Sequence, residues 1–156
     1  MASKIEVDEI FNAGGDNDTG IDLATNDQIL LKVANATRLT MNSTGQTTIV
    51  GEGGTTTTNL QQGLLKAWSK VDGTGTAAVN DSLNISGITD NSTGNYTLAM
   101  SNAMGVNTYA QTHGANCGQQ QIISATTSAY RVETSNSAGS VADVNVIGSQ
   151  ISGDLA

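Results

Sequence analysis

The sequence predicts an all-β protein, with an N-terminal strand-rich shaft or anchor and a C-terminal β-sandwich-like domain. Apolar and polar residues alternate along much of the 156-residue chain, and a period of two is typical of half-buried strands. Short clusters of Asn, Asp, Ser and Gly separate these stretches, as hairpin turns require. Proline is absent, which favours a backbone whose N–H groups are used in sheets.

Residues 1–50 are predicted to form the shaft or anchor. Ile5 and Val7 alternate with acidic residues, which indicates a strand over 4–10. Polar turns are expected at 13–20, 26–27 and 42–45. The residues whose alternation marks the remaining strands are Ile21, Leu23, Ile29, Leu31, Val33, Leu39, Met41, Thr47 and Ile49.

Residues 51–62 are expected to form a linker. GEGGTTTT at 51–58 has no periodicity and has closely spaced glycines. The apolar residues that follow, from Leu60 to Trp68, fit either a short helix or the lead into a strand, and Gly63 weakens the helical alternative.

Residues 63–156 are predicted to form the β-domain, with six to eight strands. A bulge is expected at Gly87, a long turn at 89–94, a loop at 111–121 and a turn at 135–140. The residues that mark the strands are Ala67, Ser69, Val71, Ala77, Val79, Leu83, Ile85, Ile88, Tyr96, Leu98, Met100, Ile122, Tyr130, Val132, Thr134, Val144 and Val146.

The composition indicates that one copy alone has a thin core. Hydrophobic residues make up 37% of the chain and aromatic residues 3%. Disorder is one explanation, and a β-protein that completes its core with neighbouring copies is the other. Only 13% of residues are charged and proline is missing, whereas disordered chains are rich in both. We therefore expect an ordered homo-oligomer.

The net charge of −8 argues against nucleic acid as a partner and against adsorption to anionic lipid. No apolar run approaches the ~20 residues of a membrane-spanning helix, and the start of the chain has no apolar signal segment. A single cysteine excludes an intrachain disulfide. We expect a soluble protein made in a cytosol, without membrane insertion.

Two groups of residues could hold a metal. His113 and Cys117 lie four residues apart, and Asp16, Asp18 and Asp22 fall in one polar stretch. Two ligand types at one spacing are weak evidence, and the aspartates do not fit the EF-hand pattern. No metal and no cofactor are therefore predicted.

Four aromatic residues could be platforms for stacking sugars: Trp68, Tyr96, Tyr109 and Tyr130. Trp68 and Tyr96 are expected to belong to the core, because Tyr96 lies in a cleanly alternating strand and Trp68 at the start of the domain. Tyr109 precedes the expected loop and is the better candidate for an exposed contact.

No enzymatic activity is predicted. Most acidic residues of the second half lie in or beside turns, where Asp is favoured for local hydrogen bonding. The single histidine, His113, is accompanied by no nucleophile motif.

Three stretches carry a family resemblance. Residues 59–104, from NLQQGLLKAWSKVDGTGT to NYTLAMSNAM, and the end AGSVADVNVIGSQISGDLA at 138–156 resemble a module of fibre-type structural proteins of marine tailed bacteriophages. SKIEVDEI and GIDLATNDQILLKVANATRLTMNSTGQTTIVG are similar to segments of phage tail fibres. The matched residues are turn and core positions, so the resemblance implies no chemistry.

The resemblance implies a virion protein that is made in the host cytoplasm and forms homotrimers. It also implies contacts with other virion proteins and a distal end that faces the host. The chain is short for a complete tail fibre, which leaves both a tail and a capsid location open. The alternatives are a capsid decoration protein that stabilises the shell, a polysaccharide-degrading enzyme and a cellular adhesin module.

Within the fibre interpretation, two sets of residues are candidate contacts. The N-terminal strands are expected to attach the protein to the particle, through Ile5, Val7 and Ile10. Loops at 105–121 and 135–140 are expected to contact a host cell-surface glycan or protein, through Tyr109, His113, Asn116 and Asn136. Several weak contacts on one particle would act together by avidity.

Overall fold

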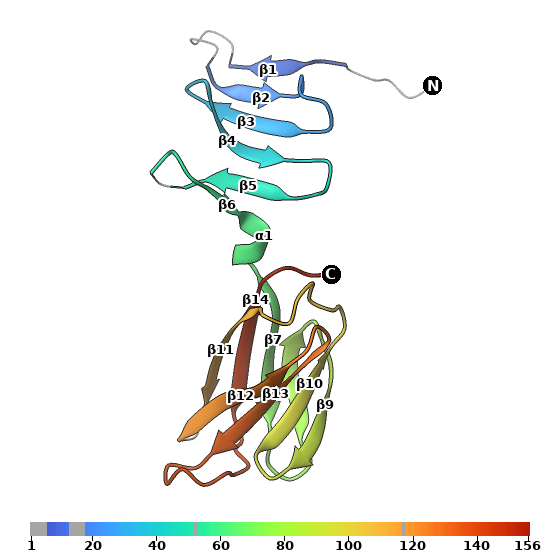
Figure 1. Cartoon of the computed structure of the whole chain (residues 1–156), viewed down its shortest axis with the longest axis vertical. Coiled ribbons are helices and arrows are strands. Elements are labelled where there is room, and N and C mark those ends of the chain that lie inside the picture. The colour runs from blue at the N-terminus through green and yellow to red at the C-terminus, as the bar shows by residue number, and fades with distance from the viewer. Residues whose placement is uncertain (1–5, 13–17, 52, 117) are drawn as a thin grey trace, which may run out of the picture. The chain divides into compact units, whose positions relative to one another are not determined.

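The computed structural model describes residues 6–12, 18–51, 53–116 and 118–156, and it confirms an all-β fold. The chain divides into two compact units, Met1–Gln61 and Gln62–Ala156 (Figure 1). None of the described residues belongs to a helix long and apolar enough to cross a membrane.

The first unit is a single antiparallel sheet whose six strands follow one another in chain order. Each strand pairs only with its neighbours in the sequence, so the unit is a meander. The strands are β1 (Glu9–Phe11), β2 (Gly20–Asp22), β3 (Ile29–Val33), β4 (Ala36–Met41), β5 (Thr47–Val50) and β6 (Thr57–Asn59).

Polar turn residues set the register of this meander. Asn42 Oδ1 accepts the N–H groups of Thr44 and Gln46, and Gly45 has a φ of 79°. This closes the β4–β5 turn that the sequence predicts at 42–45. The β3–β4 turn at Ala34 and Asn35 was not predicted; both residues have positive φ, as a two-residue hairpin loop requires.

Two predictions about the ends of this unit differ from the structure. The strand expected over 4–10 is placed at Glu9–Phe11 within the described residues, although Leu23 N–H still donates to Asp8 O at 2.6 Å. The linker expected over 51–62 contains β6, which pairs with β5, and most of the single-turn helix α1 (Leu60–Gly63). The β-propensity of its Thr residues outweighs the absence of periodicity.

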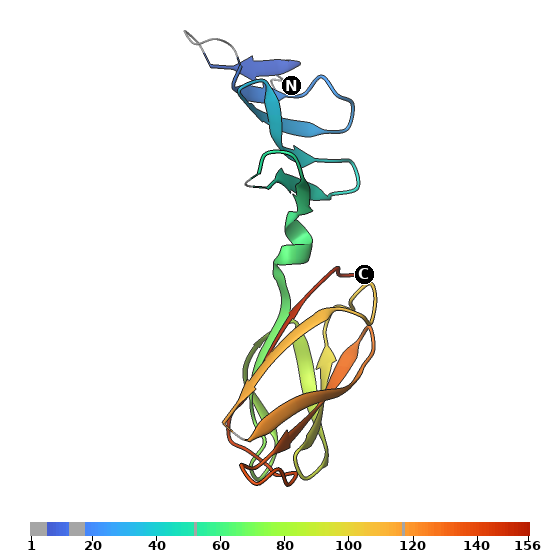
Figure 2. The same cartoon turned by 60° about the vertical axis from the view of Figure 1, so that its left-hand side comes forward.

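The second unit is a β-sandwich of two four-stranded antiparallel sheets (Figures 1 and 2). The β7 sheet has the order β11-β14-β7-β8, and the β10 sheet has the order β12-β13-β10-β9. The strands are β7 (Leu65–Asp72), β8 (Ala78–Leu83), β9 (Ile85–Ser92), β10 (Asn95–Met100), β11 (Ala110–Ala115), β12 (Gln119–Ala125), β13 (Ala129–Ser135) and β14 (Ile147–Ser152). The chain changes sheet four times within this unit, from β8 to β9 at Asn84, from β10 to β11, from β11 to β12 and from β13 to β14.

The core lies between the two sheets because alternate residues of the four central strands face inward. The buried apolar side chains of the unit form one cluster. Its members are Ala67, Val71, Tyr96, Leu98, Met100, Met104, Tyr109, Tyr130, Val132, Val144, Ile147 and Ile151. Tyr96 has no exposed surface, which confirms its predicted place in the core.

Hydroxyl groups replace apolar bulk at the centre of this core. Ser69 of β7 and Ser149 of β14 lie 2.7 Å apart (Oγ to Oγ), and both bond to the Tyr130 hydroxyl of the opposite sheet. All three residues are buried. The hydroxyl groups of Ser69, Ser149 and Tyr130 therefore join the two sheets by hydrogen bonds. In a core of large apolar side chains, packing contacts would join the sheets at this point.

A second polar contact closes one end of the sandwich. The Tyr96 hydroxyl lies 2.6 Å from Asp143 Oδ1 and 3.0 Å from Gly73 O, and it shares its one proton between these acceptors. Gly94 N–H also donates to Asp143 Oδ1, at 2.6 Å. These bonds lower the pKa of Asp143, while burial, aided by the Asp143 charge, raises that of Tyr96. Gly73 is required here, because a Cβ atom would collide with the Tyr96 ring.

Three strand predictions for this unit were wrong. The loop expected at 111–121 contains most of β11 and the start of β12, which are edge strands with few large apolar residues over this stretch. The turn expected at 89–94 is shorter, because β9 runs to Ser92. The last strand is centred on Ile147–Ser152, and Val144 is a buried residue of the loop before it.

We expect Tyr96→Phe to lower the free energy of unfolding by about 1–2 kcal/mol, because it removes the hydroxyl that bonds to Asp143 Oδ1 and Gly73 O, while Gly94 N–H still donates to Asp143. Denaturant unfolding followed by the fluorescence of Trp68, the one tryptophan, measures this for the second unit. In a double-mutant cycle with Asp143→Ala, the effect of Tyr96→Phe is smaller in the variant background. Simple additivity of the two changes contradicts the assigned contact.

Candidate functional site

The most extensive surface feature of the first unit is a line of apolar side chains on one face of its sheet. The Cα register places Ile10, Ile21, Leu31, Leu39 and Ile49 directly across from one another on five consecutive strands. Residues opposite each other in antiparallel strands project from the same face. We call these five residues the apolar row.

Among the described residues of its own unit, nothing fully buries the apolar row, since Ile21, Leu39 and Ile49 are partly buried and the other two members are exposed. Ile10 is 52% exposed and Leu31 38%, although both are strand residues with large side chains. Ile29, Val33 and Met41 lie two positions along the same strands, and each is more than 40% exposed. The sheet therefore presents a continuous apolar face to its surroundings.

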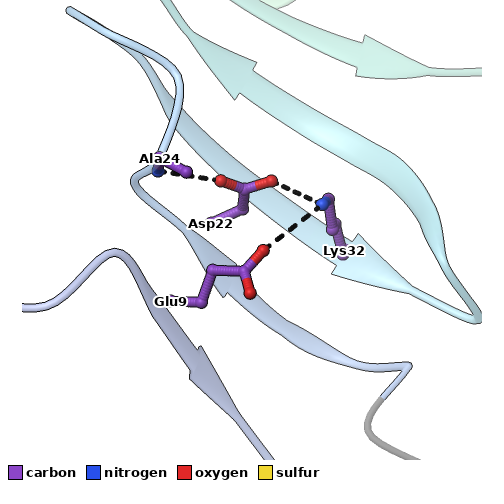
Figure 3. A network of polar contacts seen from close by, with 4 residues as sticks. All are labelled: Glu9, Asp22, Ala24 and Lys32. Carbon is purple, nitrogen blue, oxygen red and sulfur yellow. Dashed lines mark hydrogen bonds and ion pairs between the residues drawn. The ribbon is translucent and has the colours of Figure 1, made fainter.

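The opposite face of this sheet carries the ion pairs. Lys32 Nζ contacts an Asp22 carboxylate oxygen and lies 4.0 Å from Glu9 Oε1 (Figure 3). Ala24 N–H also donates to Asp22 Oδ1, at 2.9 Å. These contacts lower the pKa of Asp22, and the Asp22 carboxylate raises that of Lys32. The two faces of the sheet thus differ in chemistry.

Of the three predicted attachment residues, Ile5, Val7 and Ile10, only Ile10 belongs to the apolar row in the described structure. Ile10 is the first member of the apolar row. Val7 precedes β1 and is 44% exposed, and Ile5 lies outside the described residues. The row is the larger feature, and it was missed because the alternating residues were assigned to strands without aligning the strands with one another.

Two of the predicted contact residues meet at one end of the sandwich. Asn116 and Asn136 both line a cleft of about 390 Å³, together with Gly118, Ser137 and the loop from Ala142 to Val144. Asn136 Oδ1 is used within its own turn, where it accepts the N–H groups of Ala138 and Ser140. Asn116 Nδ2 lies 3.4 Å from Asn145 Oδ1.

Tyr109 is not the exposed contact that the sequence predicted. It is 7% exposed, and its hydroxyl donates to the carbonyl oxygens of Thr126 and Ala129, at 3.0 and 3.3 Å. Desolvation raises its pKa to about 12. The prediction was wrong because the apolar ring fills the end of the core, and the segment beside it is a strand rather than a loop.

His113 faces the interior of the sandwich from edge strand β11, with its ring centroid 6.5 Å from that of Tyr130. Both of its ring nitrogens are buried without a hydrogen-bond partner, as are Gln111 Oε1 and Gln120 Oε1 nearby on β11 and β12. Burial lowers the pKa of His113, since no acceptor compensates a positive charge there. It is therefore a structural residue rather than a surface contact.

We expect the sandwich to lose stability as the pH falls through 6.5, the ordinary pKa of histidine. The folded pKa of His113 lies below that value, so the unfolded chain takes up the proton first and is favoured as the pH drops. The carboxylates with lowered pKa values start near 3.8 and lose their contribution only in stronger acid. Urea midpoints between pH 7.5 and pH 5 measure the effect.

In His113→Gln this pH dependence is expected to disappear above pH 5. A dependence of unchanged size in the variant shows that another group is responsible.

Trp68 also departs from its prediction, because it belongs to the outer face of the β7 sheet. Along β7 the inward phase is Ala67, Ser69 and Val71, which leaves Trp68 half-buried on the other side. The same alternation in the sequence could have revealed this, since Lys66 and Lys70 share the phase of Trp68.

A hollow of about 360 Å³ lies beside Trp68. Gly148 of β14 and Gly114 of β11 are register partners there, so two adjacent positions lack outward side chains. Thr112 and Gln150, also register partners, form the next pair along the same strands. Ser69, His113 and Ser149, whose side chains belong to the inward phase of the same strands, complete its lining. We call the group Trp68, Thr112, Gly114, Gly148 and Gln150 the Trp68 hollow.

The candidate metal ligands do not form a site in the part of the chain that the structure describes. No three His, Cys, Asp or Glu side chains come together there. Asp22 is paired with Lys32, while Asp16 and Cys117 lie outside the described residues. Comparison with protein-family models, curated proteins and solved structures finds no match for this chain.

Proposed function

We propose that this chain is a non-enzymatic fibre protein of a bacteriophage virion, which assembles as a trimer through its first unit and uses its β-sandwich for attachment to a host surface. The observation that carries the proposal is the apolar row, exposed on one face of a one-layer sheet. The virion assignment itself comes from the family resemblance and stays a prediction.

The direction of the row supports an elongated assembly of the first unit. Its members come from consecutive strands, which lie ~4.8 Å apart in a sheet. The row therefore runs along the direction in which the meander grows, and each further hairpin would lengthen it. Copies that join along such a row form a rod whose strands lie across its axis.

The width of the apolar stripe favours three copies. The strands of this unit have three to six residues, and the apolar stripe is at most three side chains wide, at Ile29, Leu31 and Val33 of β3. When three narrow sheets pack around a common axis, only the side chains at the middle of each sheet reach that axis, so a narrow apolar stripe is sufficient to form the shared core. A hollow of about 470 Å³ near the row offers space for side chains of a neighbouring copy. It is lined by Leu23, Ile29, Met41 and Thr47 together with turn residues at 25–28, 42 and 45.

The sandwich is suited to being carried by such an assembly. It has its own buried core and hydrogen-bonded contacts between its sheets, so its apolar residues are covered within one copy. Three copies would hold three sandwiches together, and weak binding by each would gain from avidity.

Sedimentation equilibrium of the full chain tests the assembly. We expect a mass of three times 15.9 kDa at micromolar concentration. Leu31→Lys places a charge in the row and is expected to give monomers, because an unpaired buried charge costs several kcal/mol. Leu30→Lys is the matched control on the opposite face of the same strand, and it keeps the trimer.

Folded wild-type monomers overturn the proposed assembly, and a stable dimer overturns its threefold arrangement. Immunogold labelling of phage particles with an antibody to this chain tests the virion assignment. Label at the tail supports a tail fibre, whereas hundreds of copies on the shell favour the decoration protein. Particles without label contradict both.

A further inference from the structure

We infer that the Trp68 hollow binds an acidic saccharide, with Trp68 as the stacking surface and Lys70 as the contact for its negative charge. The inference rests on the proposed function in taking the sandwich as the binding unit, and it adds the site and the class of ligand.

The shape of the hollow suits a small ring stacked on an aromatic side chain. Trp68 forms one wall, and the floor at Gly114 and Gly148 is backbone. A Cβ atom at Gly114 would meet nothing within 4 Å, so the space above this floor is open. A volume of about 360 Å³ falls at the lower end of the range for small-ligand sites.

The polar groups at the edge suit hydroxyl-rich ligands. Thr112 offers a hydroxyl and Gln150 an amide, and each group can donate and accept hydrogen bonds. Sugars present C–H groups on their faces and hydroxyl groups around their rims. An aromatic wall with polar side chains beside it matches both surfaces.

The charges beside the hollow select an acidic ligand. The second unit has three cationic side chains, Lys66, Lys70 and Arg131. Lys66 and Lys70 lie two residues on either side of Trp68 and share its face of β7. Arg131 is engaged elsewhere, with its Nε donating to Asn95 Oδ1 at 2.6 Å.

Lys70 is the better placed of the two lysines. It is the register partner of Gly148, which forms part of the floor. Asp81 lies across from it on β8, but the two form no ion pair in the described structure. Lys66 and Lys70 thus place two cations on this face beside the carboxylate of Asp81, and Lys70 is the cation nearest to the floor of the hollow.

Fluorescence of the single tryptophan reports directly on this site. The full chain is titrated to millimolar concentration with tri-galacturonic acid, 3′-sialyllactose and glucose 6-phosphate. We expect a saturable change with at least tri-galacturonic acid, and a weaker or absent one with its neutral methyl ester. Equal affinity for the acid and its ester overturns the choice of an acidic ligand, and no response to any of the three acids overturns the site.

Two pairs of variants locate the binding. Gly114→Leu fills the hollow and is expected to abolish the response, whereas Gly87→Leu, a strand glycine of the other sheet that also has open space, keeps it. Lys70→Gln is expected to weaken acid binding about fivefold, the effect of one solvent-exposed charge pair. Arg38→Gln removes the same charge in the first unit and leaves the affinity unchanged.

Sedimentation of the same variants separates this inference from the proposed function. If Gly114→Leu changes the mass of the assembly, the hollow is an interface between copies and the inference fails. If the trimer persists but no acid binds, the inference alone fails. If the wild type is a monomer that binds acid at Trp68, the proposed assembly alone fails.

Discussion

A single β-sheet cannot bury its own apolar face, and this constraint governs both units. The sandwich meets it internally, because its two sheets cover one another and enclose Tyr96, Tyr130 and their neighbours. The described part of the first unit has no second layer, and the alternation that makes its strands leaves Ile10 and Leu31 of the row exposed and the other three members only partly buried. The same sequence period thus produces a closed core in one unit and an open apolar face in the other.

The low aromatic content has different consequences in the two units. The thin core expected from composition suggested that the whole chain depends on neighbouring copies. The sandwich instead places the hydroxyl groups of Ser69, Ser149 and Tyr130 between its sheets in place of larger apolar side chains. These hydroxyl groups form hydrogen bonds with one another. Dependence on a neighbour is therefore an argument for the first unit alone.

Alternation and turn chemistry predicted the all-β class, the Asn42 turn and the Gly87 irregularity. These features could be predicted because alternation and turn chemistry are local properties of the sequence. Most of β11 and the start of β12, up to Gln121, escaped prediction because an edge strand needs little apolar surface, and Gln, Thr and Gly conceal its period. The candidate sites were harder to predict, because the apolar row and the Trp68 hollow depend on register between strands. Register is set by turns and bulges spread over the chain, so neither group is contiguous in the sequence.

The pairing of β7 with β14 has a consequence for biosynthesis. These strands are about 80 residues apart in the sequence, since Ser69 lies opposite Ser149, whereas every pairing of the meander joins consecutive strands. Local contacts form faster than distant ones, and N-terminal units emerge from the ribosome first. The meander can therefore form while its chain is still being translated, whereas the β7 sheet stays split until β14 has been synthesised. During that interval the nascent chain presents an unpaired strand edge at β7. Such an edge can pair wrongly with another strand, so the chain is most prone to misfold, and has most use for a chaperone, at this stage.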